Sequence, residues 1–336
     1  MHRYLAKINK LKATGYLRRY LILLALLCAV TGVQAQSSTS NYPEKPIRIV
    51  VPFVAGGGGD FIARAWADKL SETLKQPVII DNRGGGNTVV GTDIVAKAAP
   101  DGYTLLLVSP SIATNPTLLP NLPYKTPEDF APVGSVITYA MGLGARATLE
   151  AESLQEMLRY ARQQPGKLAI ATSGEGSATD LAAELFKAAT GADILIVPYK
   201  GAGQGVLDVA SGHVDLLFTG MSQLKPHLDS GRIKLLATSG KNRLKSAPEI
   251  PTIAEQGVSD FEAVVWWGIL APAGTPEVII QKLNLALAQS LSHPEVTNRL
   301  AVIDGEVRLS SSKEFERFLK EEINKWRSLL KPSTQK

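Results

Sequence analysis

Four glycine-rich segments contain the residue types and spacings that best suit ligand binding: residues 53–60, 81–88, 172–177 and 197–203. Each follows a predicted strand and comes just before a predicted helix. Glycine lets the backbone turn tightly and leaves its N–H groups open to a ligand. At a helix N-terminus, unpaired N–H groups and the helix dipole attract an anion. The segments therefore predict an anion site, against the alternative that each is a plain tight connection.

A single loop of this kind is too weak to hold a ligand alone. A helix dipole contributes about 0.3–1 kcal/mol, or about 2 when partly buried, whereas micromolar affinity takes about 8 kcal/mol. Ligands in open α/β sheets bind beyond the carboxyl ends of strands, so we expect several loops to act together. Asp60 is expected to cap the helix that follows it. The candidate ligand-binding residues are Ala55, Gly56, Gly57, Gly58, Gly59, Asp60, Gly85, Gly86, Asn87, Thr88, Ser109, Asn115, Ser173, Gly176, Ser177, Tyr199, Lys200 and Gly201, with Ser111 and Thr114 as further contributors.

Some side chains near these loops could have either of two roles. Arg83 could pair with a ligand carboxylate, but a surface salt bridge is the favoured interpretation for an Arg there. Lys200 could add charge to the site, although a solvated lysine is favoured. Of the adjacent Trp266 and Trp267, at least one is expected in the core, and stacking on a ligand is the alternative.

Several catalytic and cofactor motifs are missing from the sequence. It contains no P-loop and no G-x-S-x-G elbow, and the dinucleotide fingerprint fails after Gly176. Beyond residue 35 the histidines are His213, His227 and His293, scattered away from any nucleophile pattern. No His, Asp and Glu cluster has metal-ligand spacing. We therefore expect no catalytic residue, no metal and no cofactor.

The positive charge of the 336-residue chain is concentrated at its start. The whole sequence has 36 Lys and Arg against 31 Asp and Glu, but residues 1–35 contain six bases and no acid. Residues 36–336 therefore have 30 bases against 31 acids. An apolar run over residues 20–30 and Val33-x-Ala35 complete the pattern of a signal peptide cleaved after Ala35. The alternative is an uncleaved anchor or a buried helix. The remainder of the chain is nearly neutral and contains no cysteine, because the one cysteine lies in residues 1–35. This composition fits export to an oxidising compartment and argues against a nucleic-acid partner.

Predicted strands and helices alternate along the mature chain, which favours an α/β fold with parallel strands and helical crossovers. After Pro276 the pattern predicts helices only. Nine strands favour two lobes, with crossovers near 141–144 and 261–267. The predicted strands are 47–53, 78–81, 104–108, 133–136, 168–171, 194–197, 214–218, 233–237 and 264–270. The predicted helices are 60–74, 89–97, 153–163, 178–190, 202–211, 277–291, 294–302 and 312–329.

Short motifs over nearly all of the mature chain carry a family resemblance. In order they are YPEKPIR (42–48), AGGGGD (55–60), QPV (76–78), NR (82–83), KAAPDGYTL (97–105), DFAPV (129–133), VPYKG (197–201), GHVD (212–215), PTIAEQG (251–257) and APAGTP (271–276). With these motifs the chain resembles the substrate-binding proteins of tripartite tricarboxylate transporters, the Bug or TctC-like family.

The resemblance implies a two-lobed type II periplasmic binding protein, or Venus flytrap, in which each lobe is a mostly parallel sheet flanked by helices. Lobe I is expected over residues 43–140 and 262–336, and lobe II over 141–261. It further implies a monomer that captures a small organic anion, a carboxylate, and presents it to membrane transporter subunits. The loops 55–59 and 84–88 would close over the ligand, facing 173–177 and 199–201. An exported enzyme, or a signalling sensor or adaptor on the same scaffold, remains the alternative.

The sequence departs from the family pattern at some of these positions. A Thr or Ser usually stands where Gly59 is, and the loop at Gly84 usually contains a proline. Glu175 and Asp180 could favour a ligand that also bears an amine.

Overall fold

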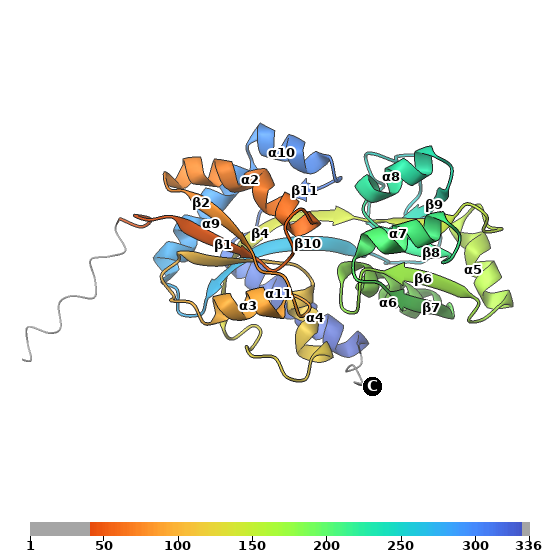
Figure 1. Ribbon diagram of the computed structural model, residues 1–336, viewed down its shortest axis with the longest axis horizontal. Helices are drawn as coiled ribbons and strands as arrows, with labels where there is room; N and C mark the ends of the chain where they lie inside the picture. Colours follow the sequence, from red (N-terminus) through yellow and green to blue (C-terminus); the bar gives the residue numbers. More distant parts are fainter. Residues whose placement is uncertain (1–40, 331–336) are drawn as a thin grey trace, which may run out of the picture. The chain divides into compact units, whose positions relative to one another are not determined.

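The computed structural model describes residues 41–330 and contains two β-sheets flanked by helices (Figure 1). The predicted signal peptide therefore lies outside the described residues. Sheet A has six strands, in the order β11-β4-β10-β3-β1-β2. They are β1 (Ile47–Val51), β2 (Val78–Asn82), β3 (Thr104–Val108), β4 (Phe130–Ala140), β10 (Val264–Pro272) and β11 (Glu306–Val307).

Sheet B has five strands, in the order β7-β6-β8-β5-β9. They are β5 (Gly142–Arg146), β6 (Leu168–Thr172), β7 (Ile194–Pro198), β8 (Leu216–Thr219) and β9 (Ile233–Thr238). Below, lobe I means sheet A with the helices packed on it, and lobe II means sheet B with its helices. The chain passes from sheet A to sheet B between Ala140 and Gly142, and it returns between Thr238 and Val264. The exact lobe limits stay a prediction.

The helices cover both sheets, and none among residues 41–330 is long and apolar enough to span a bilayer. Lobe I has α2 (Gly58–Leu74), α3 (Val89–Ala96), α4 (Ser111–Leu118), α9 (Glu277–Leu291), α10 (Pro294–Ala301) and α11 (Ser312–Leu329). Lobe II has α5 (Leu154–Gln163), α6 (Ala178–Thr190), α7 (Ala202–Ala210) and α8 (Met221–Asp229).

Local sequence explains where several helices begin. Ser153, Ser177 and Ser311 cap α5, α6 and α11 by accepting the backbone N–H three residues on. At α11 the cap is reciprocal, because the Glu314 carboxylate accepts the Ser311 N–H at 2.8 Å. These boundaries agree with the predicted ones to within a residue.

The α/β class and the two-lobed architecture are confirmed, but the sheets are mixed and not mostly parallel. In sheet A, β1 pairs in parallel with β2 and β3, whereas β10 runs antiparallel to β3 and β4. In sheet B, β6 is parallel to β7 and β8, while β5 is antiparallel to β8 and β9. The reason is the connection between lobes: β4 continues almost directly into β5, and β10 returns beside β4 (Figure 1). These strands have no helical crossover to make them parallel.

Four elements depart from the predicted pattern. Residues 142–144, expected as a glycine-rich crossover between lobes, belong to strand β5, which was not predicted. Glycine is needed there for packing, because a Cβ on Gly142 would lie 2.6 Å from the side chains of Leu224 and Leu235. Helices α4 and α8 each contain a proline, Pro116 and Pro226, which hides the helical pattern. The prediction of helices only after residue 276 is wrong, because the short β11 pairs with β4.

A Gly268→Ala substitution is expected to lower the free energy of unfolding by about 3 kcal/mol, at the upper end of what overpacking a core costs. A Cβ on Gly268 would lie 2.1 Å from Cζ of Phe315, whose ring is completely buried between β10 and α11. Urea unfolding measures the change. Gly203→Ala is the control, because a Cβ there meets nothing within 4 Å in helix α7, so stability should stay equal or rise. Equal effects of both substitutions would contradict this packing.

Candidate functional site

A cavity of about 480 Å³ lies between the two lobes, at the carboxyl ends of strands from both sheets. Lobe I contributes the segments after β1 and β3, and lobe II those after β6, β7 and β8. Its lining residues are Phe53, Gly56, Gly57, Gly58, Phe61, Ile62, Ser109, Ser111, Tyr139, Met141, Ser173, Ser177, Ala178, Thr179, Ala202, Thr219, Gly220, Ser222, Gln223, Val265, Trp267, Val302 and Ile303.

The first turns of five helices reach this cavity. Helices α2 and α4 do so from lobe I, and α6, α7 and α8 from lobe II. The first N–H groups of a helix have no carbonyl partner within the helix, and each helix dipole adds about 0.3–1 kcal/mol of attraction for an anion. Five such ends together would contribute about 1.5–5 kcal/mol to holding an anion, which is more than a single loop offers.

Among the described residues that line the cavity, none carries a charge. The polar side chains there are hydroxyls and one amide: Ser109, Ser111, Tyr139, Ser173, Ser177, Thr179, Thr219, Ser222 and Gln223. Hydroxyls both donate and accept, so they add to the backbone amides. Nor do residues 41–330 contain any group of three His, Cys, Asp or Glu that could hold a metal ion. An anion bound here would be held by dipoles.

One wall of the cavity is apolar and aromatic. The Trp267 ring contacts the Phe53 ring edge-on, with centroids 5.3 Å apart. The remaining members of this wall come from α2, from the ends of β4 and β10, and from the segment after α10: Phe61, Ile62, Met141, Val265, Val302 and Ile303. A wall of this kind suits the carbon skeleton of an organic solute.

Two buried carboxylates fold the loops at α2 and α6 in the same way. Asp60 accepts the Gly56 N–H at 2.9 Å, and Asp180 accepts the Gly176 N–H, also at 2.9 Å. The prediction that Asp60 caps α2 is wrong, because the glycine run enters the helix early and Gly57 occupies the cap. Neither carboxylate lines the cavity. Through the hydrogen bonds to Gly56 and Gly176, each carboxylate holds a loop that does.

The electrostatic surroundings of these two carboxylates differ. Arg64 donates to Asp60 at 2.9 Å and holds the pKa of that carboxyl below its usual value. Burial raises the pKa of Asp180, against hydrogen bonds from Gly176 and Thr172. The hydrogen bonds from Gly176 and Thr172 therefore explain why a carboxylate stands at position 180, without the amine-binding role considered for Asp180.

Because folding raises the pKa of Asp180 above 3.8, this carboxyl stabilises the fold most at low pH, and its contribution is lost as pH rises through the raised pKa. The unfolding free energy of the native protein relative to Asp180→Asn is expected to fall between about pH 4 and pH 7. Urea titrations at both values measure this. Asp60→Asn removes a carboxyl whose pKa is lowered. The unfolding free energy of the native protein relative to Asp60→Asn should therefore stay nearly constant between about pH 4 and pH 7. A rising or constant difference for Asp180→Asn would contradict the assignment.

The second predicted loop lies across the cleft from lobe II without lining the cavity. Asn87 donates to the Asn115 side chain at 2.9 Å and to the Glu175 carbonyl at 3.3 Å. Thr114 donates to the Gly176 carbonyl at 3.3 Å. We call these contacts the front latch, since Asn87 and Thr114 belong to lobe I while Glu175 and Gly176 belong to lobe II. The latch joins the loops of the two lobes in the conformation described.

The structure places the predicted site residues in three groups. Those in the cavity lining are Gly56, Gly57, Gly58, Ser109, Ser173 and Ser177, with Ser111. Those at or beside the latch are Asn87, Thr88, Asn115 and Gly176, with Thr114. Those outside both are Ala55, Gly59, Asp60, Gly85, Gly86, Tyr199, Lys200 and Gly201. Whether all of them contact a ligand stays a prediction.

The structure shows the surroundings of the side chains for which the sequence left two interpretations, and of Tyr199 beside them. Arg83 pairs with Asp81 at 2.9 Å on the surface, as favoured. The Tyr199 hydroxyl donates to Asp208 at 2.7 Å, while Lys200 is exposed. Trp266 is in the core, with its Nε1 donating to Glu322 at 2.9 Å, whereas Trp267 lines the cavity.

Sequence reasoning missed the contribution of β8 and α8 and, apart from Phe53 and the stacking alternative for Trp266 and Trp267, the aromatic wall. Thr219, Gly220, Ser222 and Gln223 follow a strand that was predicted, so its carboxyl end was a usable signal. The positions of Phe61 and Tyr139 gave no such signal, because a single aromatic residue within a helix or strand normally indicates the protein core.

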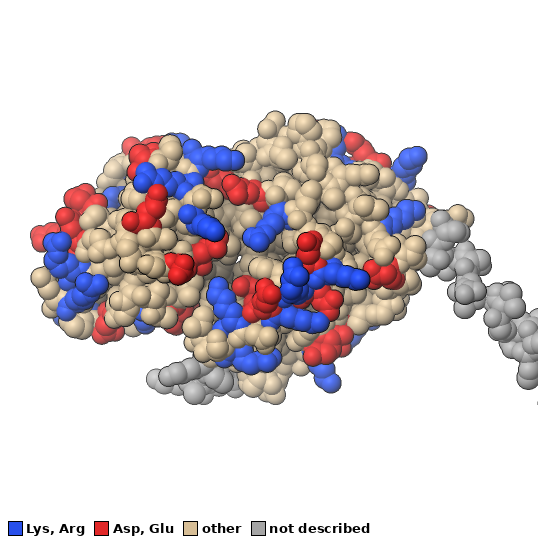
Figure 2. Space-filling model, turned by 180° about the vertical axis from the view of Figure 1, so that it is seen from behind, with Lys and Arg blue, Asp and Glu red and all other residues tan. Residues whose placement is uncertain are grey.

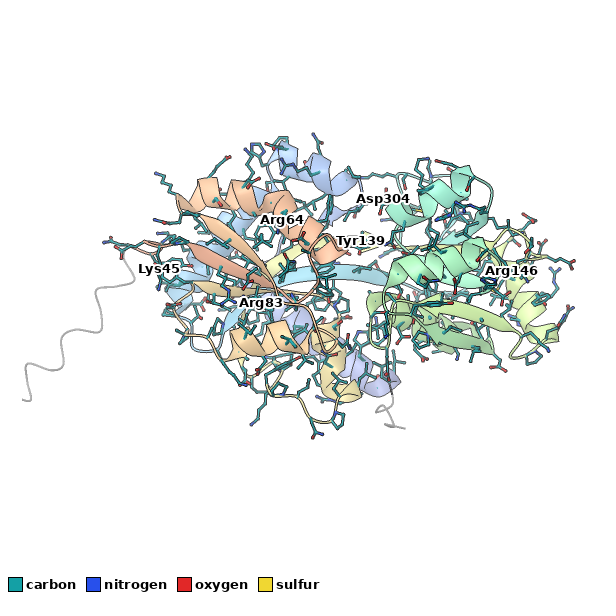
Figure 3. The ribbon with its side chains drawn as sticks, viewed as in Figure 1. Lys45, Arg64, Arg83, Tyr139, Arg146 and Asp304 are labelled. Carbon is teal, nitrogen blue, oxygen red and sulfur yellow. The ribbon has the colours of Figure 1, made fainter. Side chains whose placement is uncertain are left out.

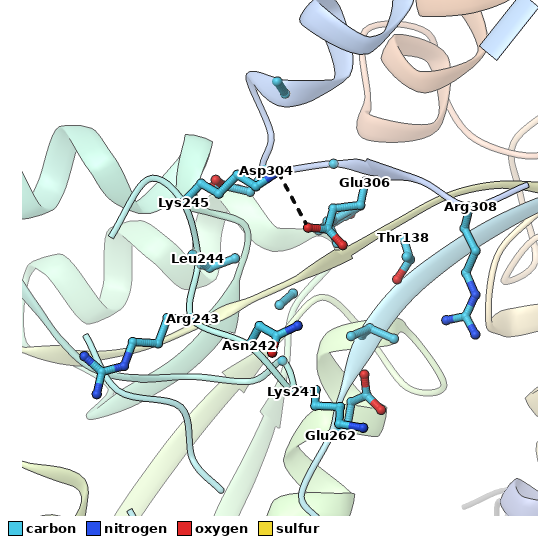
Figure 4. A pocket seen from close by; sticks show the side chains of 16 residues that line it. Thr138, Lys241, Asn242, Arg243, Leu244, Lys245, Glu262, Asp304, Glu306 and Arg308 are labelled. Atoms are coloured by element: carbon cyan, nitrogen blue, oxygen red, sulfur yellow. Dashed lines mark ion pairs between the residues drawn. The ribbon is translucent and has the colours of Figure 1, made fainter. Parts of the chain in front are cut away.

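A second cavity, of about 230 Å³, lies between the loop after β9 and the strands β4 and β11. It is lined by charges of both signs, including Lys245, Glu262, Glu306 and Arg308 (Figure 4). Lys245 pairs with Glu306 at 3.9 Å, and Ser246 donates to Asp304 at 2.5 Å, so these contacts tie the lobes together here. On the face shown in Figure 2, positive and negative side chains are likewise mixed. The distribution of charged side chains in this cavity and on this face therefore does not indicate where an anion binds.

Comparison with known proteins agrees with the fold. Residues 62–334 match the model of the tripartite tricarboxylate transporter family receptor. BugT of Bordetella pertussis is 35% identical over 320 residues, which cover 95% of this chain and 98% of that protein.

Two solved structures share both sequence and fold. Rpa4515 of R. palustris, solved with adipate, is 35% identical with a TM-score of 0.78, covering 87% of this chain and 99% of that one. MatC of Rhodopseudomonas palustris, solved with bound malate, is 30% identical with a TM-score of 0.75, covering 86% and 99%.

A cleft of this construction between two α/β lobes is that of a periplasmic binding protein. The chain belongs to the tripartite tricarboxylate transporter receptor family, the Bug or TctC-type periplasmic solute receptors.

Proposed function

We propose that the protein binds a small organic carboxylate in the cavity between its lobes, in the periplasm, and delivers it as a monomer to the membrane subunits of a tripartite transporter. The observation that carries this proposal is the convergence of five helix N-termini on one uncharged cavity. Relatives solved with adipate and malate support a carboxylate as the ligand class.

Binding without chemical conversion fits the lining. Catalysis by a serine needs a neighbouring base to take its proton, and the described lining residues include no His, Lys, Asp or Glu. Because α2 and α4 come from lobe I and α6, α7 and α8 from lobe II, a ligand touching both groups favours the closed arrangement over an open one. The front latch would form in the same step.

Isothermal titration of the folded protein with a panel of small carboxylates tests the proposal, with each carboxylate compared with its uncharged carboxamide. We expect at least one carboxylate to bind with micromolar affinity or better, and its carboxamide to bind about 100-fold more weakly, since hydrogen bonds to a charged group are the stronger ones. Binding of no panel member, or equal binding of acid and amide, would contradict the proposal.

A further inference from the structure

Two apolar side chains of the ligand cavity are exposed to solvent. Phe61 is 41% exposed and Val302 is 70% exposed, and both residues line the cavity between the lobes. Single exposed apolar side chains are common on protein surfaces. Two of them at one ligand cavity form a place where the apolar part of a ligand would be removed from water, which is favourable. We call Phe61 and Val302 the apolar rim.

Two helices of lobe I position the apolar rim. Phe61 lies in the first turn of α2. Helix α10 packs against α2 and buries Val296 and Leu300 in lobe I. Val302 follows directly after α10, past the last buried residue of that helix, and this explains why its side chain is exposed.

The segment after α10 is also held at its other end. The Asp304 carboxylate accepts a hydrogen bond from the Ser246 hydroxyl at 2.5 Å, and Figure 3 shows Asp304 at the boundary between the lobes. Val302 and Ile303 lie between the buried Leu300 and the bonded Asp304. Their place beside the cavity is therefore set by the fold of lobe I and by this contact with lobe II.

The two walls of the cavity differ in chemistry. Lobe II contributes five hydroxyls and one amide between Ser173 and Gln223, together with the N-termini of α6, α7 and α8. Lobe I contributes the hydroxyls of Ser109, Ser111 and Tyr139, and its other side chains there are apolar and include the apolar rim. A ligand between these walls matches them best when one end is polar and the rest of its body is apolar.

We propose that the solute is a monocarboxylate with an extended apolar body, which leads from the helix N-termini to the apolar rim. This inference rests on the proposed function, because the helix N-termini must hold the carboxylate. It adds that burial of the carbon skeleton against Phe61 and Val302 contributes to affinity. Short hydroxy acids and dicarboxylates would then bind more weakly than a monocarboxylate with a longer chain.

Cavity size and charge both favour such a ligand. The cavity of about 480 Å³ is within the range of sites for drug-sized ligands, about 300–1,000 Å³, so it has room for a carbon chain beyond the carboxylate. A second carboxylate at the apolar rim would lose water beside Phe61 and Val302, with no cation among the described lining residues to compensate. A methyl end at the same place would gain from losing water.

Three ligands test this inference by isothermal titration: hexanoate, octanoate and suberate. Octanoate is hexanoate with two more methylenes, and suberate is octanoate with a carboxylate in place of the terminal methyl group. We expect octanoate to bind about tenfold more tightly than hexanoate, since each buried methylene contributes about 0.8 kcal/mol. Suberate should bind about tenfold more weakly than octanoate.

Variants of the apolar rim make the result specific. In Val302→Ser, the gain from hexanoate to octanoate should fall to less than about threefold, because the added methylenes then meet a polar side chain. Phe61→Ser should have the same effect and provides a second, independent variant. Val278→Ser is the matched control, because Val278 is 54% exposed on α9 and lies outside the cavity lining. It should leave the gain unchanged.

The outcomes separate this inference from the proposed function. Equal binding of hexanoate and octanoate, tighter binding of suberate than of octanoate, or an unchanged gain in both rim variants would overturn the inference. An unchanged gain would also indicate that the rim is covered by something other than the ligand. If none of the three binds while another carboxylate does, the inference fails alone. If no carboxylate binds at all, the proposed function fails with it.

Discussion

Replacing Gly58 by Asp is expected to weaken carboxylate binding at least about 100-fold while leaving the protein folded. Gly58 is the first residue of α2 and lines the cavity, and a Cβ there meets nothing within 4 Å. A carboxylate at this position would repel that of the ligand by about 4 kcal/mol at 4 Å in surroundings of intermediate polarity. It would also compete for the free N–H groups of the helix. Titration with the tightest-binding carboxylate measures the loss.

The matched control for this substitution is Gly58→Asn, which has nearly the same size without the charge. Its affinity should stay within about fivefold of the native value, a difference of about 1 kcal/mol. An acid in the first turn favours the helix, so the thermal stability of Gly58→Asp should not fall. If Asn and Asp weaken binding equally, shape and not charge governs the site, and the anion hypothesis would be wrong.

Gly176→Ala is expected to weaken ligand binding about tenfold by obstructing closure of the lobes. Gly176 has φ +71°, and a Cβ there would lie 2.5 Å from Leu118, 3.2 Å from Asn87 and 3.4 Å from Thr114, all in lobe I. Overpacking of this kind costs about 1–3 kcal/mol. That energy opposes only the closed arrangement, so it should appear in the dissociation constant. Titration combined with small-angle X-ray scattering measures affinity and closure together.

Gly191→Ala separates the interlobe clash from backbone strain. Gly191 ends α6 at φ +65°, almost the same conformation, but a Cβ there meets nothing within 4 Å. Both substitutions should lower stability by a similar strain energy, of about 1 kcal/mol. Only Gly176→Ala should change affinity. If the two variants bind equally well, the front latch does not contribute to binding.

Sequence patterns predicted the helices that have clear caps and apolar periodicity. Helix α9 and the capped helix α11 have the bounds expected from their spacing. The patterns failed for α4 and α8, because an internal proline breaks the periodicity although neighbouring structure supports the helix. They also failed for β5, because the close approach of Leu224 that makes Gly142 necessary depends on tertiary packing and leaves no local signal.

The candidate site was predictable where a glycine loop follows a strand and begins a helix. Gly57 and Ser177 are cases in which loop composition and position both indicated the cavity. Loop composition did not show which loops line the cavity and which bridge the lobes. Asn87 and Gly57 both lie in glycine-rich loops after strands, yet Asn87 donates to the Glu175 carbonyl whereas Gly57 lines the cavity. That difference depends on how the two lobes meet.

The crystal structure of the protein with its tightest-binding carboxylate tests the central claim most directly. The account predicts that the carboxylate oxygens accept hydrogen bonds from backbone N–H groups in the first turns of α2 and α6, with no Lys or Arg within about 4 Å. It would be contradicted by a ligand whose carboxylate pairs with Arg308 in the charged cavity of Figure 4, leaving the cavity between the helix N-termini empty.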